Sequence, residues 1–254
     1  FCAMVRGFYN LTSGMLSQGR RLDVIANNMT NVSTAGYKAE HYTDRTFDEV
    51  MVTRIGNKIM QPYQTMETYQ SHILAPDHLY TDFEQSSFEE TTLPLDFAIQ
   101  GEGFFAIQME DGVAYTRAGS FTLDTEGYLC LSELGRVLDR EGNPIQLPTD
   151  KLEPDKQGNL YSKDGDYLGS LGVYMFEDNQ ELERNPYGLF TGQGAQINED
   201  AVIHHKWVER SNVNLVKEMV NMMSTQRALQ SAAQMSKIYD QVLQRVVNDI
   251  GRMQ

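Results

Sequence analysis

The sequence predicts an α+β protein: a mainly β central domain, a meander of antiparallel strands, flanked by long N- and C-terminal helices that pair in a coiled-coil-like bundle. Three observations support this fold class. Apolar residues recur every seven positions at both ends of the chain, acid–glycine pairs punctuate the middle, and the negative charge is confined to the middle. These observations divide the chain into an N-terminal helix, an extended connector, a β-rich domain and a C-terminal helix, over residues 4–38, 39–75, 76–210 and 211–254.

The first helix is predicted over residues 5–30, which contain no proline. Its apolar residues fall every seventh position, at Phe8, Met15, Leu22 and Met29. Small or polar residues precede three of them by three positions, at Thr12, Gly19 and Ala26, which permits close approach of another helix. The helix should end in the Asn-rich stretch 27–31, because Asn tolerates the backbone geometry of helix ends.

The last helix is predicted to begin near residues 211–214, where Ser and Asn can cap free N–H groups, and to run to about Gly251. The seven-residue spacing recurs at Met222, Leu229, Ser236, Leu243 and Ile250, with a second row three positions earlier at Met219, Gln226, Ala233, Asp240 and Val247. Asp240 departs from this apolar row. Either it faces Arg20 or Arg21 of the first helix, or it marks a slip of the frame toward Tyr239.

The middle of the chain reads as strands and turns. Residues 39–90 suggest an extended, hairpin-like connector. Beyond residue 93, short apolar runs alternate with turn pairs in which glycine supplies a positive φ: Asp111-Gly112, Glu126-Gly127, Glu141-Gly142, Gln157-Gly158 and Asp164-Gly165. Residues 176–210 are predicted to return the chain through turns at Asn185-Pro186 and at 192–194.

Charge and composition exclude several classes of protein. The total of -14 is unevenly spread, because 1–38 carries +3, 213–254 carries +2 and the middle carries -19. A middle this acidic disfavours nucleic acid as a partner, since phosphates require a basic face. No apolar run reaches the length of a membrane span, so no membrane insertion is expected. Residues 4–20 lack the pattern of a cleaved secretory signal, and two cysteines support no disulfide framework.

No candidate for catalysis, metal or cofactor binding emerges from the residues. Phe104 and Phe105 are predicted core residues, and Arg117 is predicted to form a structural ion pair with an acid such as Asp124. Adjacent histidines, His204 and His205, point to opposite faces of a strand and are poorly placed for one metal ion. The acids Asp164, Asp166 and Asp178 lack the spacing of a calcium loop.

Three motifs resemble the bacterial flagellar rod and hook protein family. Residues 22–32, Leu-Asp-Val-Ile-Ala-Asn-Asn-Met-Thr-Asn-Val, with Gly36, Tyr37 and Lys38 after them, resemble its N-terminal signature. Residues 101–105, Gly-Glu-Gly-Phe-Phe, and the stretch 111–127 resemble its β-domain motif. Residues 211–228 resemble its C-terminal signature. The three motifs occur in the family's order and cover most of the chain.

The resemblance implies a rod subunit that self-assembles through its terminal helices into the hollow drive shaft of the basal body, transmitting torque from motor to hook. Its partners would be copies of itself, other rod and hook proteins and the flagellar type III export apparatus. It would lie outside the cytoplasmic membrane, exported without a cleaved signal. The proximal type is slightly favoured over the distal type. The expected assembly interface comprises Phe8, Met15, Leu22, Asn27, Asn28, Met29, Met219, Met222, Leu229, Leu243 and Ile250. Arg6 and Lys38 are further candidates for meeting acids of adjacent subunits.

The alternatives are a flagellar hook subunit, another secreted β-rich binding module such as an adhesin, and an acidic hydrolase. The hydrolase would need two carboxylates in one cleft, and Glu102 with Asp111 is the least implausible pair. The binding module leaves the repeats at both ends unexplained.

Overall fold

The computed structural model describes residues 2–46, 50–52, 68–70, 74–110, 112–132, 134–150 and 152–251. The chain forms two compact units. Unit 1 comprises Phe1–Asn27, Glu40–Tyr80 and Val216–Gln254, and unit 2 comprises Asn28–Ala39 and Thr81–Leu215. The chain therefore starts and finishes in unit 1.

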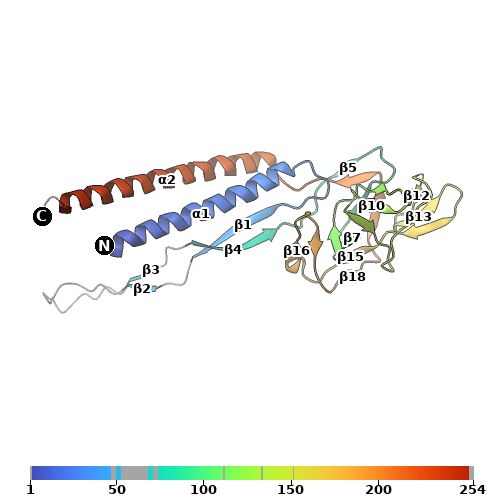
Figure 1. Ribbon diagram of the computed structural model, residues 1–254. Coiled ribbons are helices and arrows are strands. Elements are labelled where there is room, and N and C mark those ends of the chain that lie inside the picture. The colour runs from blue at the N-terminus through green and yellow to red at the C-terminus, as the bar shows by residue number, and fades with distance from the viewer. Residues whose placement is uncertain are drawn as a thin grey trace. The chain divides into compact units, whose positions relative to one another are not determined.

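Unit 1 combines the two long helices with two short strand pairs (Figure 1). The helices are α1 (Cys2–Thr30) and α2 (Leu215–Gly251), and their outer ends lie at the same end of the unit. The strands β1 (Glu40–Thr46) and β4 (Leu74–Thr81) pair with each other, and β2 (Val50–Val52) pairs antiparallel with β3 (Thr68–Gln70). Both predicted helices and the hairpin-like connector are confirmed over the described residues.

Unit 2 is built from antiparallel strands. Its largest sheet has the order β16-β17-β8-β7-β11-β10-β9, with β15 on β7 and β18 on β15. These strands are β7 (Phe104–Met109), β8 (Gly112–Thr116), β9 (Thr122–Leu123), β10 (Leu129–Leu131), β11 (Gly135–Val137), β15 (Val173–Met175), β16 (Glu183–Arg184), β17 (Phe190–Thr191) and β18 (Gln196–Ile197). A 3-10 turn, η1, covers Asn179–Glu181.

Three smaller sheets complete unit 2. The three-stranded sheet is β12-β13-β14, and the two-stranded pairs are β19 with β6 and β20 with β5. The bounds are β5 (Phe88–Glu90), β6 (Phe97–Gln100), β12 (Leu152–Pro154), β13 (Asn159–Ser162), β14 (Tyr167–Ser170), β19 (Val202–His205) and β20 (Trp207–Glu209). The predicted meander is therefore only partial: β9-β10-β11 and β12-β13-β14 follow chain order, whereas β7 lies between β8 and β11, with β15 also paired to it.

The strand β7 is central because both of its faces are apolar. Phe105 and Ile107 belong to the larger hydrophobic core, and Phe104 and Ala106 belong to a smaller one. Successive side chains of a strand alternate between its faces, so these four residues supply both cores. The prediction that Phe104 and Phe105 are core residues is confirmed, with exposures of 1% and 0%. Besides these packed faces, β7 has strand neighbours on both edges, because it lies between β8 and β11 and also pairs with β15.

The predicted glycine turns are confirmed wherever the structure describes them; Asp111 lies outside the described residues. Gly127 has φ +82°, and its N–H donates to Asp124 O while its carbonyl accepts from Leu147 N. A Cβ at this position would lie 3.0 Å from Leu147 O. The return path is more ordered than predicted, because residues 183–209 supply five strands as well as the turn at Asn185.

Replacing Gly127 by valine should destabilise unit 2 by about 1–3 kcal/mol, because valine at a positive φ is strained and its Cβ meets the Leu147 carbonyl. The chain's single tryptophan, Trp207, lies in unit 2, so its fluorescence during denaturant unfolding reports this unit. The matched variant Gly142→Val has a similar φ of +84° with open space around the added Cβ. Its loss should be smaller, and equal stability of all three proteins would refute the role of this turn.

Candidate assembly site

The predicted interface residues of α1 divide between exposed and half-buried positions. Phe8 is 40% exposed, whereas Met15, Leu22 and Met29 are half-buried. Leu16, which the seven-residue pattern omits, is more exposed than Phe8. The side chain of Arg6 lies outside the described residues. Phe8 and Leu16 are therefore apolar positions of α1 that remain exposed.

A polar contact holds α1 to β1 within unit 1. Asp44 accepts a hydrogen bond from Ser17 Oγ (2.5 Å) and pairs with Arg21 Nη2 (2.7 Å). Arg21 therefore has an acid on its own connector. Of the two arginines predicted to face Asp240, Arg21 pairs with Asp44 instead, and Asp240 is exposed; the alternative with Arg20 stays a prediction.

The covered face of α2 follows a four–three alternation along the described helix. Its buried or half-buried positions include Glu218, Met222, Thr225, Leu229, Ala232, Ser236, Tyr239, Leu243 and Val246. The predicted row containing Met222 and Leu243 is thus on the covered face. The second row lies one residue earlier than predicted, and Tyr239 takes the place of Asp240. The row is displaced along the whole described helix rather than slipping at Asp240, and the displacement leaves that acid exposed.

An apolar stripe remains exposed on α2. Near the start of the helix it comprises Val216, Met219, Val220 and Met223, and further along it comprises Met235, Ile238 and Val242. Met219 is 49% exposed and lies on this stripe rather than on the covered face. The side chain of Ile250 lies outside the described residues. Apolar residues at helical spacing on an exposed face are typical of a surface that another helix covers.

The two asparagines of the N-terminal signature have different surroundings. Asn27 is exposed, whereas Asn28 is buried and its Oδ1 accepts a hydrogen bond from the Tyr37 hydroxyl at 3.1 Å. Both lie in the last turn of α1, which ends at Thr30 as predicted. Asn28 therefore contacts Tyr37 of its own chain within unit 2, while Asn27 lies at the surface.

A buried charge cluster of Lys38, Arg117 and Glu209 lies where the chain enters and leaves unit 2. Glu209 Oε1 accepts from Lys38 Nζ (2.7 Å) and from Ser86 N (3.0 Å), and Glu209 Oε2 pairs with Arg117 Nη1 (3.3 Å). Lys38 and Glu209 side chains are 1% exposed and that of Arg117 is 5% exposed. Each of the three comes from a different part of the sequence.

Two cations share one carboxylate in this cluster, and backbone carbonyls supply further acceptors. Lys38 Nζ donates to Glu84 O (2.7 Å), and Arg117 Nη2 donates to Gly101 O (2.6 Å). Burial lowers the pKa of Lys38 and of Arg117, and the Glu209 carboxylate opposes both shifts. Removing one member of such a buried set leaves an uncompensated charge.

Two neighbouring contacts join the same segments. Asn212 Oδ1 accepts from Ala39 N (2.7 Å), and Asn212 Nδ2 donates to Asp82 O (2.8 Å). Gly36 has φ +69°, and a Cβ there would overlap the backbone of Ala118. Residues 36–39 and 209–212 are therefore fastened to the β-domain within unit 2, and residues of all three family-like motifs take part.

Several sequence predictions are corrected by these contacts. Lys38 does not reach an acid of an adjacent subunit, because it is buried against Glu209. Arg117 pairs with Glu209 rather than Asp124, and Asp124 instead lies 3.6 Å from Arg136. Sequence reasoning missed Glu209, which lies 171 positions from Lys38.

The remaining polar candidates have structural partners. His204 Nε2 lies 2.8 Å from Gln100 Oε1, and His205 Nε2 lies 2.7 Å from Pro94 O. No group of three His, Cys, Asp or Glu residues in the described ranges is arranged to hold a metal ion. Among the helices that the structure describes, none is both long and apolar enough to cross a bilayer.

Three family profiles match the chain in order. The profile described as "Flagella basal body rod protein" matches residues 8–38. "Flagellar hook protein FlgE/F/G D1 domain" matches 98–154, and "Flagellar basal body rod FlgEFG protein C-terminal" matches 205–250. The first and third cover most of the two helices, and the second covers the strands around β7.

Full-length relatives carry the same description. The chain is 30% identical to the flagellar basal-body rod protein FlgG of Bacillus subtilis, over 96% of this chain and 99% of the relative. It is 33% identical to the flagellar basal-body rod protein FlgF of Mesorhizobium japonicum, over 91% of each. FlgF of Caulobacter vibrioides is 28% identical over 98% of this chain and the whole relative.

Proposed function

This chain belongs to the flagellar basal-body rod proteins, structural subunits rather than enzymes, and from that premise we propose how it assembles. Copies of the chain join one another, and other rod and hook proteins, through α1 and α2. The joined helices form the wall of a hollow shaft that transmits torque from the motor to the hook.

The observation that carries this proposal is the exposed apolar stripe of α2. Four residues of its first turns are apolar and at least 49% exposed: Val216, Met219, Val220 and Met223. Exposed apolar surface on a helix is stabilised when another helix covers it. Methionine side chains adapt to slightly different neighbours, as a shaft with several kinds of subunit requires.

Within one chain, α1 and α2 form a coiled-coil-like pair in this proposal. The four–three spacing of covered positions on α2 is the spacing of such a pair. On α1, the residues at seven-residue spacing are also half-buried: Met15, Leu22 and Met29. The exposed apolar stripe of α2 then contacts helices of neighbouring subunits.

The route to the shaft in this proposal is the flagellar type III export apparatus, without a cleaved signal, to a position outside the cytoplasmic membrane. Export through a narrow channel favours segments that unfold readily. Helices that rely on partners for stability meet this requirement, because isolated helices are marginal in water.

The proposal is tested by expressing a chain that ends at residue 214 in a bacterium whose own copy of the gene is deleted. Purified basal bodies imaged by electron microscopy should contain no complete shaft, whereas the full chain restores it. Retained Trp207 fluorescence in the truncated chain would show that unit 2 still folds. Complete shafts built from the truncated chain would contradict assembly through α2.

A further inference from the structure

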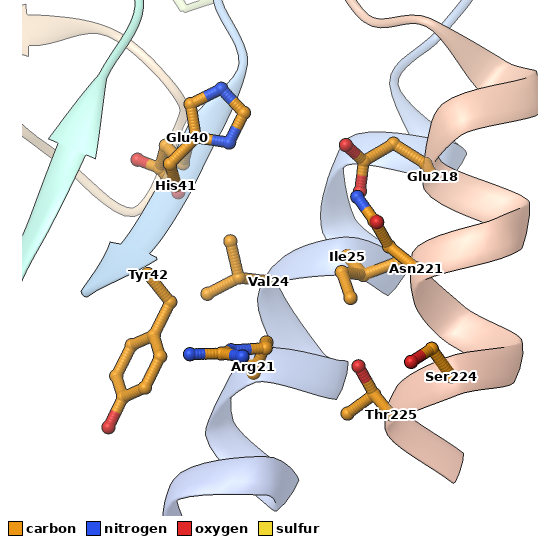
Figure 2. A pocket seen from close by; sticks show the side chains of 10 residues that line it. All are labelled: Arg21, Val24, Ile25, Glu40, His41, Tyr42, Glu218, Asn221, Ser224 and Thr225. Carbon is orange, nitrogen blue, oxygen red and sulfur yellow. The ribbon is translucent and has the colours of Figure 1, made fainter. Parts of the chain in front are cut away.

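Unit 1 contains a cavity between its two helices and β1 (Figure 2). Its volume is about 270 Å³, more than ten times the roughly 10–15 Å³ that one water requires on this scale. Ten residues line it: Arg21, Val24, Ile25, Glu40, His41, Tyr42, Glu218, Asn221, Ser224 and Thr225. The cavity is therefore large enough for the end of a side chain.

The charge that carries the argument at this cavity is the Glu218 carboxylate. Glu218 is 4% exposed. The lining cation Arg21 is already paired with Asp44 at 2.7 Å. Among the described residues, none donates a hydrogen bond or forms an ion pair with the Glu218 carboxylate. A carboxylate more than nine-tenths buried thus lines a cavity whose arginine is paired with Asp44.

A buried carboxylate without a partner is costly, so its position needs an explanation. Glu218 lies in the first turn of α2, where the helix dipole favours a negative charge by a modest amount. A cation bound in the cavity would offset the rest of the cost of burying the Glu218 carboxylate. The Asn221, Ser224 and Thr225 side chains add hydrogen-bonding groups around the same space, and Val24 and Ile25 offer an apolar wall for an aliphatic stem.

We propose that this cavity receives the cationic end of an arginine or lysine from α2 of a second copy of the chain, an inference that rests on the proposed shaft function. Charge complementarity identifies the source. Arg227, Lys237 and Arg245 are exposed on α2 and form no ion pair with any described residue. Each presents a long cationic side chain on the helix that carries the exposed apolar stripe.

The cavity itself is tested with the n-propylguanidinium ion as probe, added to the isotope-labelled full chain. The amide NMR signals of Ser224 and Thr225 should shift and saturate, and n-propylurea, a neutral isostere, should leave them unchanged. Glu218→Gln should weaken the guanidinium response about tenfold or more, because a charge-assisted hydrogen bond is lost. Unshifted signals, or an equal response of Glu218→Gln, would overturn the site.

The second copy is tested by charge reversal in cells that lack the native gene. Glu218→Lys should prevent shaft formation, and combining it with one of Arg227→Glu, Lys237→Glu or Arg245→Glu should restore shafts. Glu199→Lys, the same change at an exposed position of unit 2, should have no effect. Glu218→Gln keeps the side-chain volume and should reduce shaft number, which separates lost recognition from misfolding.

The outcomes separate this inference from the function beneath it. If the chain truncated at residue 214 fails to assemble while Glu218→Lys builds normal shafts, the cavity inference is wrong and the shaft function stands. If no reversed pair restores Glu218→Lys, α2 of a second copy is not the source of the cation. If the truncated chain builds shafts, the shaft function through α2 fails first.

Discussion

Replacing Glu209 by alanine should lower the free energy of unfolding of unit 2 by about 3–5 kcal/mol. The substitution leaves Lys38 and Arg117 buried without their shared carboxylate, and it also removes the acceptor of the Ser86 N–H. Denaturant unfolding followed by Trp207 fluorescence measures the loss directly, because Trp207 lies two residues away in β20.

The matched control for Glu209→Ala is Glu89→Ala. Glu89 pairs with Arg210 at 3.4 Å, but both side chains are mostly exposed, so the loss should be below about 1 kcal/mol. A double-mutant cycle between Lys38→Met and Glu209→Gln should show strong coupling. Equal, small losses for the Glu209 and Glu89 variants would mean that the buried cluster does not hold unit 2 together.

Leu22→Asp or Leu243→Asp should abolish shaft assembly while unit 2 remains folded. Both leucines are half-buried on the helices of unit 1, and a carboxylate there loses water without gaining a partner. Electron microscopy of basal bodies should find no complete shafts, and Trp207 fluorescence should report unfolding of unit 2 at the same denaturant concentration as in the unchanged chain.

Gln244→Asp controls for the added charge on α2. Gln244 is exposed and adjacent in sequence to Leu243, so the same charge stays in water there. This variant should build shafts, since the carboxylate is not buried. Normal shafts from Leu22→Asp or Leu243→Asp would contradict the role of the helical seam in assembly.

Local patterns in the sequence were sufficient to predict the two helices and the glycine turns. The helix ends near Thr30 and Leu215 follow from Asn and Ser residues whose capping chemistry is local. The positive φ at Gly127 and Gly142 follows from the acid–glycine pairs. The seven-residue spacing put Met222, Leu229 and Leu243 on one face of α2, and all three are half-buried. One helix face repeats nearly every seven residues, so this pattern is local.

Other features depend on contacts between distant residues and were not predictable from one sequence. The second row on α2 runs through Thr225 and Tyr239, since burial is decided by what lies opposite the helix rather than by apolar character alone. Glu209 looks like any surface acid in sequence, and only the fold brings it to Lys38 and Arg117. Lys38 and Arg117 both belong to the motifs that resemble the family, and this is the one local signal of the cluster.

The order of sheet strands and the position along the shaft were also beyond local patterns. The strand β7 acquires β11 and β15 as neighbours through long-range pairing, so the meander prediction held only in parts. The preference for a proximal subunit stays a prediction, and much of the connector lies outside the described residues. Relatives named FlgF and FlgG match at 33% and 30% identity, and these similar values favour neither position.

The most direct test of assembly through the terminal helices is amide hydrogen exchange, compared between the free monomer and purified shafts. We predict rapid exchange over residues 5–27 and 216–250 in the monomer, strong protection of β7 in both states, and protection of both helices gained only in the shaft. Helices as protected as β7 in a verified monomer, with no further gain in the shaft, would contradict the account.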